Sequence, residues 1–89
     1  MFVIIVGGGK TGSSLASLLL AEGNRVCVIE PRPEVLARLR QEMQESCLFA
    51  GDGADPATLE ATGIADAHVL AAVTGEDETN LVIATLARF

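Results

Sequence analysis

A glycine-rich turn that follows a short apolar run is the feature that most constrains how this chain can fold. Phe2–Val6 is apolar throughout and rich in β-branched side chains, which is typical of a strand buried on both faces of a sheet. Residues 7–12 read GGGKTG and match the pattern G-x-G-x-x-G. Apolar side chains then recur at helical spacing over residues 11–22, and Gly23 with Asn24 ends the helix.

Strands and helices alternate along the rest of the sequence. Apolar runs at residues 25–30, 47–50 and 67–73 predict three further strands. An amphipathic helix is predicted over residues 34–44, a short helix between Asp55-Pro56 and Gly63, and a last helix over residues 77–89.

This alternation predicts the fold class, because parallel strands need long crossover connections. We expect a single α/β domain over residues 1–89, with a Rossmann-like doubly wound parallel sheet. The sheet is truncated to about four strands, with helices on both faces. The first strand should be central, with the second and third strands on one side and the fourth on the other.

Composition excludes several classes of function. The 89 residues form at most one small domain, and the formal charge of −6 argues against nucleic acid or an anionic membrane as the main partner. No apolar run is long enough for membrane insertion and no signal peptide is recognisable, so we expect a cytoplasmic protein. Cys27 and Cys47 lie in apolar runs without CxxC spacing and are expected to be buried free thiols.

Each fixed glycine of the turn has its own mechanical reason. Gly7 permits the tight turn, Gly9 lets the backbone approach a pyrophosphate, and Gly12 lets the helix lie close to the sheet. Amides at the helix start then face the phosphates. Lys10 can reach a phosphate, although an exposed lysine at a helix start is an equal alternative. The candidate nucleotide-binding residues of this turn are Gly7, Gly8, Gly9, Lys10, Thr11 and Gly12.

An acidic residue, Glu30, ends the second predicted strand, where such a residue accepts hydrogen bonds from ribose hydroxyls. A carboxylate there repels a 2′-phosphate, so NADP is disfavoured. Arg32 qualifies this expectation, since an arginine in this loop can accommodate that phosphate. The alternative is that Glu30 is only a solvated strand end.

Beyond the turn, the chain resembles one family, the N-terminal lobe of RCK domains (regulators of potassium conductance), also called TrkA-N domains. The resemblance rests on GDGADP at residues 51–56 with Leu59 and ATGI at 61–64, and on ADA at 65–67 leading into VTGEDETN at 73–80. It implies that Asp52 lies beside the adenine and that Arg32 flanks the adenosine. It also implies that Thr74 and Gly75 lie near the phosphates or the second ribose, and that Lys10 approaches the terminal phosphates. Turn and helix-cap roles are the alternatives for Asp52 and for residues 74–80.

The resemblance implies a function as well as a fold. We expect a regulatory domain that binds NAD(H) or ATP/ADP and controls potassium uptake or a potassium channel. It would act as a homo-oligomer with a membrane transporter or channel subunit. Family lobes continue past the point where this sequence stops, so we expect an incomplete lobe of a longer protein, or one completed by another chain. Ending there would leave the fourth strand as an exposed edge.

The alternative class is the cofactor-binding domain of an NAD-dependent oxidoreductase, since the fold alone does not decide function. The sequence has no Tyr and a single histidine, His68, at the start of a predicted strand and so opposite the ligand edge. We therefore expect no catalytic residue and no metal site in this chain.

Overall fold

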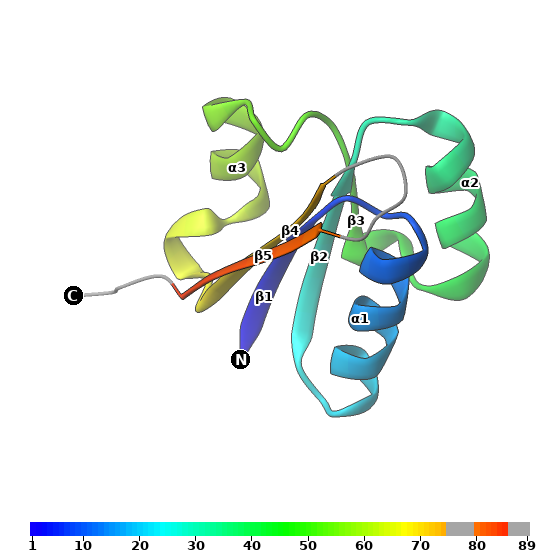
Figure 1. The fold of residues 1–89 in the computed structure, drawn as a ribbon, viewed down its shortest axis with the longest axis horizontal. Helices are drawn as coiled ribbons and strands as arrows, with labels where there is room; N and C mark the ends of the chain where they lie inside the picture. Colours follow the sequence, from blue (N-terminus) through cyan, green and yellow to red (C-terminus); the bar gives the residue numbers. More distant parts are fainter. Residues whose placement is uncertain (75–79, 86–89) are drawn as a thin grey trace.

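Strands and helices alternate from the first residues onward, as the sequence predicts (Figure 1). The structure is a computed structural model that describes the backbone of residues 1–74 and 80–85 and the side chains of residues 1–73. In chain order its elements are β1 (Phe2–Val6), α1 (Lys10–Ala21), β2 (Arg25–Glu30), α2 (Pro33–Glu42), the 3-10 turn η1 (Glu45–Cys47), β3 (Leu48–Ala50), α3 (Pro56–Thr62), the 3-10 turn η2 (Ile64–Asp66), β4 (Val69–Thr74) and β5 (Asn80–Thr85).

The strands form one sheet in the order β3-β2-β1-β4-β5. β1 is central and pairs in parallel with β2 and β4, so that Val3 lies opposite Val26 on one side and Val69 on the other. β3 pairs in parallel with the end of β2. α1 and α2 cover one face of the sheet and α3 covers the other (Figure 1). The predicted Rossmann-like doubly wound sheet, with its central first strand, is therefore confirmed.

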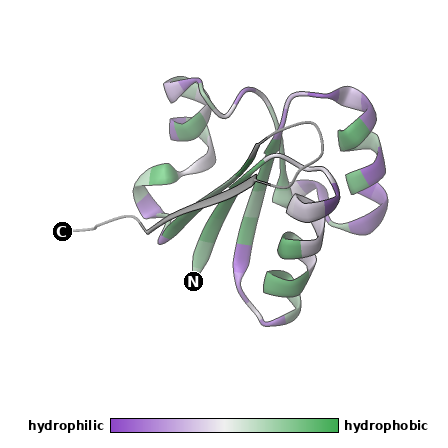
Figure 2. Ribbon diagram, viewed as in Figure 1, coloured by the Kyte–Doolittle hydropathy of each residue, from purple (hydrophilic) through white to green (hydrophobic). Residues whose placement is uncertain are grey.

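Alternate side chains of β1 fill two separate aliphatic layers. Val3 and Ile5 pack in a cluster with Leu39 of α2 and Ala16 of α1. Their neighbours Phe2 and Ile4 pack on the opposite face, where Leu59 of α3 and Ile64 of η2 cover them. Figure 2 shows that β1 is coloured as hydrophobic along its length. Because β1 is buried on both faces, packing holds the end of this strand in place, and the glycine turn follows directly from it.

The short helix α3 begins and ends as the sequence predicts. The Asp55 side chain caps it by accepting a hydrogen bond from the Ala57 amide at 3.1 Å, and Pro56 occupies its first position. Gly63 follows with φ of 91°, a left-handed conformation that favours glycine. The cap and the glycine together fix where the chain re-enters the sheet.

The predicted helix over residues 77–89 is wrong for residues 80–85. This segment is strand β5, and it pairs antiparallel with β4, with Ala71 opposite Ile83. The β4 edge predicted to be exposed is thus paired. An apolar run such as Leu81-Val82-Ile83 fits a strand as well as one face of a helix, and an antiparallel partner needs only a short connection. Residues 75–79 and 86–89, including the rest of the predicted helix, lie outside the described residues.

Cys27 and Cys47 are free thiols; Cys27 is buried as predicted, but Cys47 is only half-buried. Burial is the main cause that raises the pKa of the Cys27 thiol, which keeps it protonated. In the part of the chain that the structure describes, no helix has both the length and the apolar character needed to cross a membrane.

Candidate nucleotide-binding site

The glycine turn leaves no room for side chains at three of its positions. Gly7 has φ of 107°, and a Cβ there would lie 2.8 Å from the Val73 carbonyl oxygen. A Cβ on Gly12 would overlap the Gly7 carbonyl oxygen, and one on Gly8 would lie 2.6 Å from Leu39 Cδ1. The turn is therefore bare backbone, packed between β4, α2 and its own start. These contacts are with the protein itself, so packing within the fold explains the three glycines.

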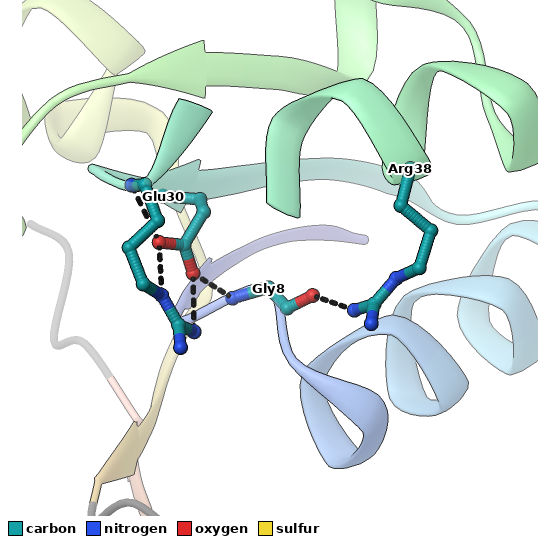
Figure 3. Close-up of polar contacts among 4 residues, drawn as sticks. Gly8, Glu30 and Arg38 are labelled. Carbon is teal, nitrogen blue, oxygen red and sulfur yellow. Dashed lines mark hydrogen bonds and ion pairs between the residues drawn. The ribbon is translucent and has the colours of Figure 1, made fainter. Parts of the chain in front are cut away.

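Gly8 was a variable position of the sequence pattern, and the structure gives it a role of its own. Its amide donates a hydrogen bond to Glu30 Oε1 at 2.9 Å. Its carbonyl oxygen accepts one from Arg38 Nη2 at 3.0 Å (Figure 3). For Arg38 the sequence predicts only a place in the amphipathic helix over residues 34–44. No local pattern predicts that its side chain crosses to the turn.

Glu30 ends β2 and is only 1% exposed, although it lies at the end of a strand. Besides the Gly8 amide, it accepts hydrogen bonds from the Arg32 amide at 2.8 Å, Arg32 Nε at 3.0 Å and Arg32 Nη2 at 3.1 Å (Figure 3). The alternative that Glu30 is a solvated strand end is therefore wrong. The carboxylate links the end of β2 to the glycine turn.

The charge state of Glu30 follows from these contacts. Burial raises the pKa of its carboxyl group, but the hydrogen bonds from Arg32 and Gly8 and the positive charge of Arg32 outweigh that effect. The net result is a pKa below the ordinary value of a glutamate. A buried, ionised acceptor thus lies beside the turn at neutral pH.

The two residues that open α1 face the same end of the sheet. Lys10 is exposed and Thr11 is half-buried. The preceding residue, Gly9, supplies no side-chain cap to the helix. The helix start therefore places its positive dipole end and an exposed cationic side chain at the carboxyl end of β1, which suits a phosphate.

Asp52 lies in the loop after β3, at the same edge of the sheet. Its side chain is exposed and accepts a hydrogen bond from the Ala54 amide at 2.9 Å, which is a turn-forming contact. A Cβ on the adjacent Gly53 would overlap the Val6 side chain, so this loop packs against the end of β1. The structure thus brings the Asp52 loop next to the glycine turn.

Of the two remaining candidate residues, the structure describes only the backbone of Thr74. Thr74 is the last residue of β4, opposite Asn80 of β5, and its side chain is outside the described part. Gly75 lies outside the described residues altogether. Because β4 neighbours β1, the Thr74 backbone still ends at the same carboxyl edge as the turn.

Other chemistry lies away from this edge. A cavity of about 410 Å³, lined among others by Phe2, Arg25, Cys27 and Cys47, opens at the amino ends of β1 and β2. Within residues 1–74 and 80–85, no group of three His, Cys, Asp or Glu side chains is placed to hold a metal ion.

A doubly wound parallel sheet, a glycine turn after its central strand and an acidic side chain at the end of the next strand define the Rossmann-like class of nucleotide-binding domain. Comparison with known proteins identifies the family within this class. The family model of the TrkA-N domain matches residues 3–89, and the chain belongs to that family. The resemblance seen in the sequence is thereby confirmed.

Curated relatives carry the same family name. The chain is 40% identical over 88 residues to "Trk system potassium uptake protein TrkA homolog" of Methanothermobacter thermautotrophicus, covering 99% of this chain and 40% of the relative. It is 38% identical over 86 residues to "Trk system potassium uptake protein TrkA" of Vibrio alginolyticus, covering 97% of this chain and 19% of the relative. The chain thus spans less than half the length of these relatives.

Proposed function

We propose that this chain is a regulatory domain that binds an adenine nucleotide and thereby controls a potassium uptake system. The observation that carries the proposal is the buried, ionised Glu30 carboxylate, hydrogen-bonded to the Gly8 amide of the glycine turn. Relatives named as Trk system potassium uptake proteins support the potassium part of the proposal.

The groups present fit an adenosine diphosphate unit. The bare backbone of the turn and the start of α1 suit the pyrophosphate, while Glu30 suits the ribose hydroxyls. The Asp52 loop and Arg32 border the place where the adenine would lie. Because NAD(H), ADP and ATP share this unit, each is a ligand under the proposal. NADP is disfavoured, since its 2′-phosphate would face the Glu30 carboxylate.

Regulation requires that the nucleotide favour one conformation of the assembly over another. We propose that the domain works in the cytoplasm as a homo-oligomer attached to a membrane potassium transporter or channel subunit. In that setting the nucleotide is bound and released without being turned over.

The oxidoreductase alternative has less support in the geometry. His68 lies just before β4, at the amino edge of the sheet, and its Nδ1 accepts a hydrogen bond from the Phe2 amide at 3.0 Å. This histidine is thus held at the end of the sheet opposite the glycine turn. A nicotinamide positioned near the turn would not meet it.

Calorimetric titration of the chain with NADH, NADPH, ATP, ADP and AMP tests the proposal. We expect binding by NADH, ADP or ATP and weaker binding by NADPH. Glu30→Gln should weaken ADP binding by about tenfold, the equivalent of roughly 1.4 kcal/mol. Glu45→Gln is the matched control, because Glu45 also pairs with an arginine but is exposed. No binding by any nucleotide would exclude the site, and unchanged ADP affinity in Glu30→Gln would exclude Glu30 as the ribose acceptor.

A further inference from the structure

We propose that Arg32 is an internal competitor for the ribose site. Its guanidinium group holds the positions on Glu30 that a ribose diol needs, so diol binding and the Arg32–Glu30 ion pair exclude one another. The inference rests on the proposed function and adds a residue that sets which ribose the site selects.

Glu30 has a limited number of positions at which it can accept hydrogen bonds. An ionised carboxylate has two oxygens with about four positions at which it accepts hydrogen bonds. Oε1 accepts from the Gly8 amide and Arg32 Nη2, and Oε2 accepts from the Arg32 amide and Arg32 Nε, at 2.8 to 3.1 Å. All four positions are in use. A ribose diol can bind only where one or more of these donors leave.

The four donors around Glu30 differ in how firmly they are held. The Gly8 amide belongs to the packed turn, and the carbonyl oxygen of the same residue accepts a hydrogen bond from Arg38. The Arg32 amide is fixed because Arg32 precedes Pro33, which restricts it to extended backbone, here φ −84° and ψ 119°. The two guanidinium bonds differ, because they come from a side chain that is 52% exposed.

The two guanidinium hydrogen bonds match the two hydroxyl donors of a ribose diol in number. The guanidinium group donates one hydrogen bond to each Glu30 oxygen, and a 2′,3′-diol carries two hydroxyl donors on neighbouring carbons. Exchange of the fork for the diol leaves every acceptor of the buried carboxylate filled. A ligand without these hydroxyls cannot make that exchange. Arg32 therefore lowers the affinity for every ligand that carries the diol. A nucleotide without the diol cannot replace the guanidinium group, so it gains no hydrogen bond from Glu30.

Calorimetric titration of the full chain with ADP and with 2′,3′-dideoxy-ADP tests the inference, using Arg32→Ala. With the fork removed, ADP should bind about three- to fivefold tighter, the size expected from losing a partly exposed ion pair. The affinity for dideoxy-ADP should change by less than about twofold, because the gain acts through the diol. Arg40→Ala is the matched control, since Arg40 is 49% exposed and also pairs with a glutamate, Glu45. It should leave both affinities unchanged.

Each result bears on the inference. Wild-type binding of ADP with equal or weaker binding by Arg32→Ala would overturn it and leave the proposed function in place. An equal gain for ADP and dideoxy-ADP would also overturn it, because Arg32 would then act away from the diol. Failure of both proteins to bind ADP would overturn the inference, and failure to bind NADH and ATP as well would overturn the proposed function with it. Arg32→Lys, which keeps the charge but lacks the planar fork, provides a second variant and should give a smaller gain.

Discussion

Two arginine–glutamate pairs in this chain have similar ion-pair distances and different surroundings. Arg32 Nε lies 3.0 Å from Glu30 Oε2, and Arg40 Nε lies 2.8 Å from Glu45 Oε2. The arginines are similarly exposed, at 52% and 49%, but the glutamates are 1% and 69% exposed. The shorter pair is the one in solvent, where such pairs contribute little to stability. Burial of the acceptor, and not the distance, makes the Glu30 pair part of the fold.

The largest expected difference between the two pairs is the change in unfolding free energy when each glutamate is replaced by glutamine. Glu30→Gln replaces an acceptor by an amide whose NH₂ group faces donors, so we expect a loss of about 2 kcal/mol of unfolding free energy. Glu45→Gln should cost less than about 0.5 kcal/mol. Urea denaturation of the three proteins measures both values. Equal losses would show that the burial of Glu30 does not distinguish the two pairs.

Acid should reduce the difference in unfolding free energy between wild type and Glu30→Gln. The pKa of Glu30 is lowered in the folded chain from an unfolded value of about 4.5, so its contribution is present above that value. It is lost as the pH falls through the lower folded pKa. The stability gap between wild type and Glu30→Gln should therefore shrink below about pH 4.5. Unfolding free energies measured from pH 7 to pH 3 would contradict this if the gap stayed constant or widened.

The smallest expected effect compares two arginines on α2. Arg38→Ala removes the hydrogen bond from Nη2 to the Gly8 carbonyl oxygen, and we expect a loss of about 1 kcal/mol. Arg40→Ala removes only a solvent-exposed ion pair and should cost less than about 0.5 kcal/mol. Thermal unfolding of both variants decides the order. A larger loss for Arg40→Ala would mean that the Gly8 peptide does not depend on Arg38.

Much of the fold could be predicted because its signals are local. The apolar run of β1, the glycines after it and the Asp55 cap of α3 each depend on a few adjacent residues. The strand order follows from general rules for parallel strands. Residues 80–85 were predicted wrongly, since their choice between strand and helix depends on pairing with β4, a contact that periodicity does not encode.

The candidate site divides in the same way. The type of residue at position 30 follows from its spacing after the glycines, and the sequence therefore gives the acid beside the turn. Its burial, its bonds to the Arg32 fork and the reach of Arg38 to Gly8 depend on side-chain conformations across three elements. Leu39 shows the same limit, because its approach to Gly8 explains a glycine that the pattern leaves variable.

The hydrogen bond from the Gly8 amide to Glu30 gives this chain a built-in spectroscopic reporter. An amide proton that faces an ionised carboxylate at a donor–acceptor distance of 2.9 Å senses the charge and the occupancy of that carboxylate directly. In a ¹⁵N-correlated NMR spectrum, one backbone resonance would follow both the protonation of Glu30 and any exchange of its partners. The chain would need no chemical label for this purpose, because its own backbone reads the state of the site.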